Sequence, residues 1–358
     1  MKAVVLVGGE GTRLRPLTLS TPKQMLPILE QPMIERVLGH LAAHGIDEAI
    51  LSLGYLPDAF LTAYPDGTSA GVRLTYAVEP EPLDTAGAVR FAADHAGIDE
   101  TFVVVNGDVL TDMDVSALIA FHHDRRAEGT IALYPVADPS AFGVVPTDDD
   151  GRVTAFVEKP PRDEAPTNLI NAGTYVLEPS VLRRIPAGRR VSIERETFPA
   201  MVRDGGLFAL ADEAYWLDTG TPTAYLQAHR DLMEGRRAVP PAPGARRADG
   251  GYWVVGAPVV DGSVAGPSLL ADGARVAAGA RVERSALGPG AVVEADSVVV
   301  DSVLLAGARV AAHSVVSGSV LGPRSTIGER CDVRPTSVLG AGAVVASGTV
   351  VDGERVPG

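Results

Sequence analysis

Short apolar runs alternate with longer amphipathic stretches over residues 1–235. The runs include residues 3–7, 49–53, 73–78, 102–106 and 130–136, and several are apolar at nearly every position. Uniformly apolar strands are typical of a sheet covered on both faces, and the stretches between them are long enough for crossover helices. The pattern therefore predicts an α/β domain.

Two of the longer stretches carry clear helix signals. In residues 32–44 apolar side chains recur at helical spacing, and Gly45 follows where a left-handed C-cap is wanted. Residues 222–234 repeat the arrangement, with Gly235 as the cap. We expect one helix in each stretch.

Residues 236–251, RRAVPPAPGARRADGG, interrupt this alternation. The segment has four arginines, three prolines and no periodic apolar face, which is typical of an exposed connector. We therefore expect a first domain over residues 1–235, a linker over 236–251 and a second domain over 252–358.

The second domain is dominated by Val, Ala, Gly and Ser and contains a repeat. Ser285, Ser302, Ser319 and Ser337 open similar segments, so each begins 17 or 18 residues after the last. Within the segments an aliphatic residue returns at every sixth position. One inward aliphatic residue per six is the pattern of a hexapeptide parallel β-helix, whereas a β-sandwich would alternate with period two.

Composition and charge narrow the possible partners. The 358 residues exceed the usual size of one core, in keeping with two domains. A formal net charge of -14 argues against nucleic acid as the main partner, and no apolar run is long enough to span a membrane. The single cysteine, Cys331, and an N-terminus without a cleavable apolar segment predict a cytoplasmic location.

Glycines and basic residues are closest together just after the first apolar run, in VGGEGTRLRPLTLSTPK at residues 7–23. Glycines after a buried strand let backbone N–H groups approach phosphate oxygens, and Arg13 offers a guanidinium fork that matches phosphate geometry. The spacing fits neither GxGxxG nor a Walker loop. Taken alone, the glycines are equally typical of a tight turn with solvated arginines.

The longer string GGEGTRLRP followed by TPK resembles the signature of the sugar-1-phosphate nucleotidyltransferases. Further family motifs follow in order: EPEPLDTAGA at 79–88, VNGDVL at 105–110, FGVV at 142–145, FVEKP at 156–160, INAGTYV at 170–176 and YWLDTGTP at 215–222. The tail is similar to that of the mannose-1-phosphate guanylyltransferases within this family. The resemblance implies a Rossmann-like nucleotidyltransferase domain with a mixed sheet, followed by a left-handed β-helix.

The resemblance also implies an enzyme that joins a sugar 1-phosphate to the α-phosphate of a nucleoside triphosphate and releases pyrophosphate. Mannose 1-phosphate with GTP is the preferred pair, while glucose-1-phosphate thymidylyl- and uridylyltransferases share every motif. A phosphate monoester is mostly dianionic at neutral pH, so the nucleophile needs no general base. It needs alignment and neutralisation of negative charge.

Several residues match the family's nucleotide and phosphate contacts. In the resemblance, Arg13 grips the leaving pyrophosphate and Lys23 contacts phosphate oxygens near the reacting centre. Asp108 and Asp218 match the two carboxylates that hold Mg²⁺, a hard ion bound through one or two carboxylates plus phosphate oxygens. Backbone contacts to the nucleotide are implied for Gly8, Gly9, Gly11 and Thr12.

Other residues match the positions that read the sugar and the base. Lys159 is expected to take the sugar phosphate, with Glu158 and Asn171 on the hydroxyls and Gly143 and Gly173 beside them. For the base, Gly87 matches a glycine at a helix start. Asp84 departs from the family, where many relatives have Gly. It either faces solvent, caps that helix through residues 85–87 or alters nucleotide preference, and we expect the cap.

Two other readings remain open. A regulatory protein could bind a nucleotide sugar without turnover, although the intact Arg13, Lys23, Asp108, Lys159 and Asp218 argue against it. A bifunctional protein could use His313 for acyl transfer, but a lone histidine in a solenoid is more often a surface or interface residue. We expect the β-helix to serve assembly into a homo-oligomer instead.

Overall fold

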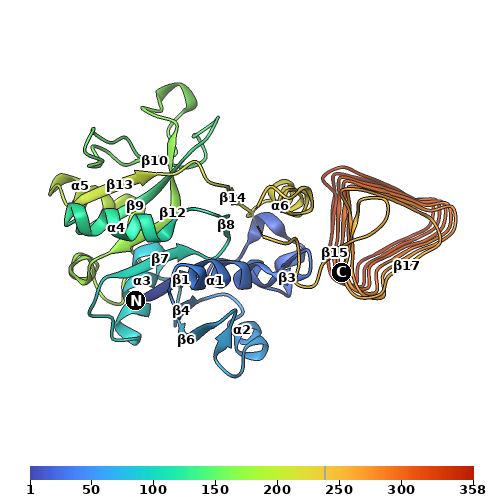
Figure 1. Cartoon of the computed structure of the whole chain (residues 1–358), viewed down its shortest axis with the longest axis horizontal. Helices are drawn as coiled ribbons and strands as arrows, with labels where there is room; N and C mark the ends of the chain where they lie inside the picture. Colours follow the sequence, from blue (N-terminus) through green and yellow to red (C-terminus); the bar gives the residue numbers. More distant parts are fainter. Residues whose placement is uncertain (238) are drawn as a thin grey trace. The chain divides into compact units, whose positions relative to one another are not determined.

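The computed structural model describes residues 1–237 and 239–358, and its contacts divide the chain into two compact units (Figure 1). The first unit consists of Met1–Gly9 and Ile34–Trp216. The second unit consists of Glu10–Met33 and Leu217–Gly358. The glycine-rich loop is therefore shared: Gly8 and Gly9 belong to the first unit, and Gly11 through Lys23 belong to the second.

The described part of the first unit is built on a ten-stranded mixed sheet. Its centre is parallel: β1 (Lys2–Leu6) pairs with β4 (Glu48–Leu53) on one side and with β7 (Phe102–Asn106) on the other. The remaining strands are β6 (Val72–Val78), β5 (Thr68–Ser69), β12 (Leu169–Leu177), β9 (Gly129–Pro135), β13 (Leu207–Ala211), β10 (Gly143–Val144) and β11 (Val157–Glu158). Strand β12 runs antiparallel to β7, which makes the sheet mixed.

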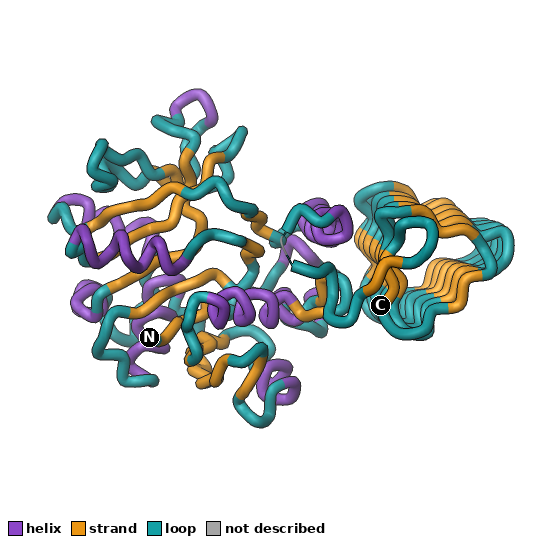
Figure 2. Tube along the Cα trace, viewed as in Figure 1, coloured by secondary structure: helices purple, strands orange, loops and turns teal. Residues whose placement is uncertain are grey.

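Helices cover this sheet, as the apolar strands predict (Figure 2). They are α1 (Met33–Ala43), α2 (Asp58–Ala63), α3 (Asp84–His95), α4 (Val115–Arg125) and α5 (Phe198–Arg203). The core beneath α3 joins Val4 of β1, Val104 of β7 and Val89 of the helix, all fully buried. None of the helices in the described residues is both long and apolar enough to cross a lipid bilayer.

The predicted elements are confirmed to within about one residue at each end. The apolar run 102–106 coincides with β7, and the stretch 222–234 coincides with α6 (Pro222–Glu234). Gly45 and Gly235 both take the left-handed conformation expected of a C-cap, each with φ 76°.

The second unit contains a parallel β-helix with three flat faces, seen end-on as a triangle in Figure 1. Successive strands of each face pair in register, as β22 (Ala286–Leu287), β25 (Val303–Leu304) and β28 (Val320–Leu321) do on one face. The aliphatic residues at every sixth position, such as Leu304, Val310 and Val316, are fully buried inside the coil. The predicted hexapeptide β-helix is confirmed.

Buried serines form a second ladder along the coil. The backbone N–H of Ser302 donates to Oγ of Ser285 (3.1 Å), and that of Ser319 donates to Oγ of Ser302 (3.2 Å). Each hydroxyl in turn donates to a nearby backbone carbonyl, as Ser302 does to Val300 (2.7 Å). The serines that open each repeat are thus satisfied polar groups that link one coil to the next.

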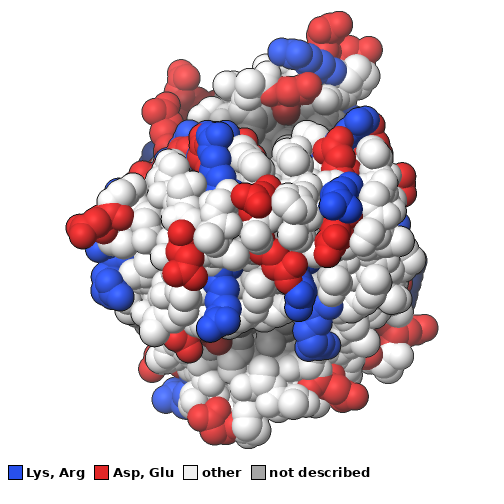
Figure 3. All heavy atoms as spheres, turned by 90° about the vertical axis from the view of Figure 1, so that its right-hand side faces the viewer, with Lys and Arg blue, Asp and Glu red and all other residues white. Residues whose placement is uncertain are grey.

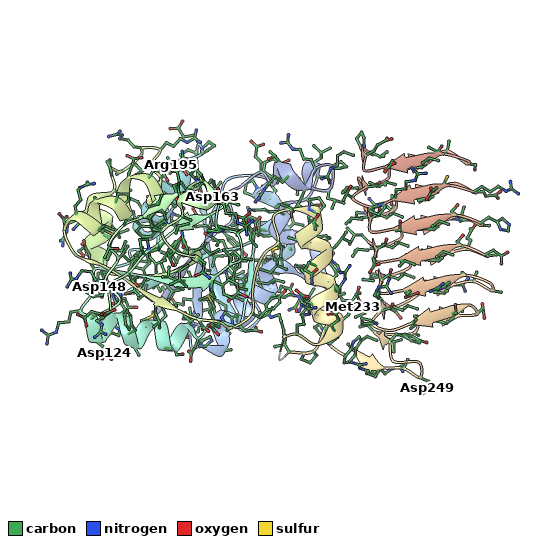
Figure 4. All side chains as sticks on the ribbon, turned by 90° about the horizontal axis from the view of Figure 1, so that it is seen from above. Asp124, Asp148, Asp163, Arg195, Met233 and Asp249 are labelled. Carbon is green, nitrogen blue, oxygen red and sulfur yellow. The ribbon has the colours of Figure 1, made fainter. Side chains whose placement is uncertain are left out.

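One face of the β-helix is buried on both sides. The outward residues Val303, Val320 and Val338 of this face are at most 2% exposed, whereas Val344 on another face is 72% exposed. Helix α6 lies along the buried face, as Figure 4 shows near Met233. Its Arg230 pairs with Asp301 (3.2 Å). We call this the docking face.

The predicted linker packs in part against the first coil. Arg237 and Ala242 are buried, although the composition predicts an exposed segment. Residues Arg246–Arg247 form β15, which pairs with β16 (Trp253–Val254), and the Arg247 guanidinium lies 4.5 Å from the centre of the Trp253 ring. Residue 238 of the linker lies outside the described residues.

Acidic and basic side chains are interspersed on the face shown in Figure 3. Within the β-helix, Arg334 pairs with Asp332 of its own strand (2.9 Å) and with Asp352 of the next coil (2.8 Å). On the face shown in Figure 3, the described residues form no extended basic patch of the kind that binds a nucleic-acid backbone.

Candidate active site

Gly8 lies two residues after the end of β1, at the carboxyl edge of the parallel strands. A methyl group in place of its hydrogen would lie 3.3 Å from Oε1 of Glu79 and 3.4 Å from the backbone nitrogen of Gly54. Glu79 is held in place, because its carboxylate accepts hydrogen bonds from Ser52 Oγ (2.9 Å) and from the Leu83 N–H (3.1 Å). Burial raises the pKa of Glu79 above its usual value. The tight space explains a glycine here, and it keeps the backbone after β1 open to a ligand.

Gly11 makes the turn that presents Thr12 and Arg13. Its φ is 63°, and a methyl group there would lie 3.0 Å from Cγ2 of Thr18 and 3.1 Å from Cβ of Lys23. The Gly11 carbonyl accepts hydrogen bonds from Thr18 Oγ1 (2.9 Å) and from the Leu14 N–H (2.9 Å). Both the positive φ and the closeness of Thr18 and Lys23 therefore favour glycine at position 11. The turn also brings Lys23 beside the start of the loop.

Arg13 and Asp218 lie side by side in the second unit, although they are far apart in sequence. Nη2 of Arg13 is 3.7 Å from Oδ2 of Asp218, with the arginine side chain 61% and the aspartate side chain 28% exposed. Oδ1 of Asp218 accepts a hydrogen bond from the Gly220 N–H (2.8 Å). A methyl group on Gly220 would lie 2.4 Å from Nη2 of Arg13. Gly220 thus leaves room for the guanidinium, a role that sequence reasoning missed although the WLDTG motif contains the residue.

Asp108 follows β7 in the turn before β8 (Val109–Thr111). The N–H of Gly107 donates to the Leu6 carbonyl at the end of β1 (3.0 Å). Since β1 and β7 are neighbouring parallel strands, Asp108 and Gly8 leave the sheet at the same edge. This carboxyl edge is where open α/β sheets bind ligands.

The predicted sugar residues Gly143, Glu158 and Lys159 are brought together by a strand pair. Gly143 of β10 pairs with Glu158 of β11, and a methyl group on Gly143 would lie 2.7 Å from the Phe156 ring. Nζ of Lys159 lies 3.2 Å from Oε1 of Glu158. Lys159 has φ 50°, an uncommon conformation for a side-chain-bearing residue, and its N–H donates to the Phe142 carbonyl (3.0 Å). The backbone thus fixes where this lysine leaves the chain.

Asn171 and Gly173 shape an irregularity in β12. Oδ1 of Asn171 accepts the Gly173 N–H (3.0 Å), and its amide nitrogen donates to the buried Tyr175 hydroxyl (2.9 Å). The pairing with β9 shifts register between Asn171 and Tyr175. Gly173 has φ 75°, and a methyl group there would lie 2.5 Å from Nδ2 of Asn106. These contacts interrupt the regular pairing of β12 at the point where it lies beside Asn106, the last residue of β7.

An aromatic cluster lies next to these sugar motifs, and sequence reasoning did not single it out. The rings of Tyr134 and Trp216 stack with centroids 5.4 Å apart, and Phe142 meets Trp216 edge-on at 5.6 Å. The indole N–H of Trp216 donates to the Ala172 carbonyl (2.8 Å). All three aromatic side chains are half-buried. Phe142 and Trp216 stand in the quoted motifs FGVV and YWLDTGTP, which was the available signal.

Gly87 and Asp84 lie in the first turn of α3. The Gly87 N–H donates to the Val191 carbonyl (3.2 Å), and a methyl group on Gly87 would lie 2.6 Å from the Arg189 carbonyl oxygen. Asp84 has φ 60°, and its Oδ1 accepts the N–H of Thr85 (2.8 Å). The expectation that Asp84 caps this helix is wrong: Asp84 is the first residue of α3, Leu83 occupies the N-cap without a side-chain cap hydrogen bond, and the N–H groups of residues 86 and 87 bond to the Val191 carbonyl. A positive φ explains why glycine suits position 84.

The predicted site residues divide between the two units. The second unit holds Gly11, Thr12, Arg13, Lys23 and Asp218, and the first holds Gly8, Gly9, Gly87, Asp108, Gly143, Glu158, Lys159, Asn171 and Gly173. Within the described residues, no three His, Cys, Asp or Glu side chains are grouped as a ready-made metal site. Asp108 and Asp218 are the two metal ligands that the family motifs predict.

Known proteins resemble both parts of this chain. Residues 2–235 match the family described as Nucleotidyl transferase, and residues 264–357 match the family described as GMPPB C-terminal domain. The mannose-1-phosphate guanylyltransferase of Mycobacterium tuberculosis is 43% identical over 296 residues, covering 78% of this chain and 81% of the relative. Mannose-1-phosphate guanylyltransferase 1 of Arabidopsis thaliana is 38% identical, covering 79% of this chain and 80% of the relative.

Solved structures agree with these matches. HddC from Yersinia pseudotuberculosis, crystallised with GMP-PN, superposes with a TM-score of 0.56 at 30% identity, covering 64% of this chain and 98% of its own. A putative glucose-1-phosphate thymidylyltransferase from Bacillus anthracis gives a TM-score of 0.58 at 25% identity, covering 64% of this chain and 94% of its own.

Proposed function

The chain belongs to the nucleotidyl transferase family, and we propose that it joins mannose 1-phosphate to the α-phosphate of GTP, forming GDP-mannose and releasing pyrophosphate. The observation that carries this proposal is the pair of Arg13 and Asp218, placed side by side by a turn in which Gly220 leaves room for the guanidinium. The choice of mannose and guanine rests on relatives of that name with 43% and 38% identity.

The reaction requires positioning more than proton transfer. An oxygen of the sugar phosphate attacks the α-phosphorus, the bond from that phosphorus to the bridging oxygen breaks, and pyrophosphate leaves with the electron pair. We assign the backbone of Gly8, Gly9, Gly11 and Thr12 to the triphosphate. Arg13 neutralises charge that develops on the leaving pyrophosphate, and Lys23 neutralises charge near the reacting phosphorus.

The sugar phosphate is assigned to the cluster at β10 and β11. Lys159 is half-exposed, so its ammonium can leave Glu158 and contact the phosphate, while Glu158 and Asn171 bind hydroxyls beside Gly143 and Gly173. The half-buried rings of Tyr134 and Trp216 offer an apolar surface to the carbon face of a sugar. Gly87 is assigned to the base.

Asp108 and Asp218, the aspartates of the motifs VNGDVL and YWLDTGTP, are suitable ligands for a divalent metal ion. Enzymes of this family generally use such an ion, and we propose that it is Mg²⁺, held by Asp108 and Asp218. Oδ2 of Asp218 faces Arg13 at 3.7 Å, while Oδ1 is fixed by the Gly220 N–H, so the carboxylate has a set orientation. Two carboxylates suit Mg²⁺, which takes its other ligands from phosphate and water. When bound, the ion would lower the charge of the phosphate oxygens.

Residues 1–235 form the proposed nucleotidyltransferase domain, residues 236–251 the linker and residues 252–358 the β-helix domain. We also propose that the protein acts in the cytoplasm as a homo-oligomer, with the exposed aliphatic residues of the β-helix, such as Val344, available for contact between copies.

The test is a matrix of reactions with Mg²⁺ and pyrophosphatase, in which phosphate release is followed. GTP, UTP, dTTP, ATP and CTP are each paired with mannose, glucose, galactose and N-acetylglucosamine 1-phosphates. We expect GTP with mannose 1-phosphate to react fastest. A preference for dTTP or UTP with glucose 1-phosphate would identify a thymidylyl- or uridylyltransferase, and binding of a nucleotide sugar without turnover of any pair would identify a regulatory protein.

A further inference from the structure

We propose that the β-helix positions the arginine of the catalytic loop, through a contact between Gly340 of its last coils and Pro16. The catalytic loop is defined here as residues 11–19. The inference rests on the proposed function, because it assigns Gly340 as a positioning residue for the reaction in which Arg13 takes part. It gives the β-helix a task beyond assembly.

Pro16 and Gly340 approach each other so closely that a side chain at 340 would crowd Pro16. A methyl group on Gly340 would lie 3.2 Å from Cβ and 3.4 Å from Cγ of Pro16. Pro16 is buried, and it stands three residues after Arg13. Between them Leu14 is fully buried, and the N–H of Arg15 donates to the Thr12 carbonyl (3.2 Å). A shift of Pro16 is therefore passed to Arg13 through a short, hydrogen-bonded turn.

Helix α6 ties the next part of the same segment to the β-helix. The Leu29 N–H donates to Nδ1 of His229 (3.2 Å), and the Tyr225 hydroxyl donates to the Pro27 carbonyl. On its other side the helix is held by the β-helix, because the Trp253 indole donates to the Met233 carbonyl (2.9 Å). Residues 27–29 are thus fixed to the β-helix through α6.

The same helix also places Asp218, the partner of Arg13. Thr221 caps α6, its Oγ1 accepting the Ala224 N–H (3.2 Å), and Asp218 lies three residues before that cap. Thr219 is buried and lies 3.1 Å from the sulfur of Met33. Arg13 and Asp218 are therefore both carried by segments that are anchored on the docking face.

The outward residues of the docking face are apolar, as expected of a surface that packs against other parts of the chain. The outward residues of the docking face are aliphatic in successive coils, namely Leu269, Ala286, Val303, Val320 and Val338, and all are buried. The outward position of another face holds Arg275, Val292, Arg309, Thr326 and Val344 instead, none of which is buried. A stack of coils with a close-packed core is stiff, so it can hold the loop to a fraction of an ångström.

The test compares substitutions at two glycines in the same position of the repeat. Gly340→Ala would bring its methyl group to 3.0 Å from the Gly358 nitrogen and 3.2 Å from Pro16. Gly288→Ala would bring its methyl group to 3.0 Å from the Ala306 nitrogen, with no part of the catalytic loop among its nearest neighbours. Both add similar crowding inside the coil, but only the first pushes on the loop. Gly340→Val enlarges the push.

Two readouts are needed. With the preferred substrate pair, we expect kcat to fall about tenfold for Gly340→Ala and about a hundredfold for Gly340→Val, with the KM for the sugar 1-phosphate within about twofold of the parent value. Gly288→Ala should keep the parent kcat. Backbone amide hydrogen exchange in residues 11–19 should become faster in the Gly340 variants and stay unchanged in Gly288→Ala.

The outcomes separate the two proposals. Parent activity with unchanged kcat and exchange in Gly340→Val overturns the positioning role and leaves the proposed function intact. Equal losses of kcat in Gly340→Ala and Gly288→Ala also overturn it, because crowding in the coil would then be the cause. If the parent chain turns over no substrate pair, the exchange experiment still decides whether Gly340 holds the loop.

Discussion

Nη2 of Arg13 lies 3.7 Å from Oδ2 of Asp218, while Oδ1 of the same carboxylate is fixed by the backbone N–H of Gly220. The pair joins the first motif of the chain to the last motif before α6. In the proposed reaction each partner also has a phosphate or metal to bind, so the pair holds both groups in place before substrates arrive. The predictions below begin from this arrangement.

Replacing Arg13 should damage catalysis far more than folding. Arg13→Gln removes a charge from a side chain that is 61% exposed, so the unfolding temperature should stay within about 2 °C of the parent value. We expect kcat/KM to fall about 100- to 1000-fold, because charge developing on pyrophosphate loses its partner. The matched control is Arg15→Gln, which removes an exposed arginine paired with Glu10 (2.7 Å). A similar loss in both variants would contradict a specific role for Arg13.

Gly220→Ala tests the space that Arg13 occupies. The new methyl group would lie 2.4 Å from Nη2 of Arg13, so the guanidinium must move, and we expect kcat to fall at least about tenfold. The methyl group would also lie 2.9 Å from Oδ1 of Asp218, and because both crowded atoms end flexible side chains, stability should change little. Gly39→Ala is the control, since its methyl group would have only Ala70 within reach, at 3.9 Å. Steady-state kinetics and thermal unfolding of both variants decide the matter.

Asp218→Asn should change the metal requirement. An amide keeps the oxygen that accepts the Gly220 N–H but loses the negative charge, so we expect the Mg²⁺ concentration for half-maximal rate to rise about 10- to 100-fold. A titration of initial rate against Mg²⁺ measures this. Glu213→Gln, at an exposed position nearby in sequence, is the control. An unchanged titration for Asp218→Asn would remove this residue from the proposed metal site.

Substitutions at Asp84 should separate backbone strain from side-chain bonding. Asp84→Ala keeps φ at 60° and loses the hydrogen bond to the Thr85 N–H, so we expect the free energy of unfolding to fall by about 1–2 kcal/mol. Asp84→Gly loses the same bond but relieves the backbone, and it should match the parent to within about 1 kcal/mol. Denaturant unfolding of the parent and the two variants ranks their free energies of unfolding. An equal loss of stability in Asp84→Ala and Asp84→Gly would exclude backbone strain.

Glu30 should make stability depend on pH. Burial raises its pKa from 4.5 to about 7, so the folded chain holds this proton more tightly than the unfolded chain does. The contribution of Glu30 to stability is therefore lost as the pH rises from about 4.5 to about 7. We expect Glu30→Gln to be more stable than the parent at pH 8 and similar to it at pH 4.5, by denaturant unfolding. Glu81→Gln, at an exposed position, is the control for removing a carboxylate.

Much of the fold could be predicted because it depends on local patterns. Strand β7 is apolar from Phe102 to Val105, α6 is bounded by Thr221 and Gly235, and the β-helix repeats one buried aliphatic residue in six. Each element therefore carries its own signal. The candidate site was found in the same way, from short motifs whose spacing is preserved. The family matches confirm the nucleotidyltransferase resemblance and the tail.

What could not be predicted involves residues whose partners are distant in sequence. Gly220 lies within a recognised motif, yet its role appears only when Arg13 lies against it. The rings of Tyr134, Phe142 and Trp216 come from three separate segments, so no local pattern links them. Asn171 was assigned to sugar hydroxyls, and the structure adds that its amide also shapes β12.

The sequence by itself determined the elements, the repeat and the chemical type of each site residue, because propensity, periodicity and motif spacing act over a few residues to a few dozen. The tertiary structure alone decided that residues 10–33 form one compact unit with α6 and the β-helix, and that Gly340 lies against Pro16. Such contacts depend on the packing of complementary surfaces from residues hundreds of positions apart. Packing of this kind produces no repeating pattern in the sequence.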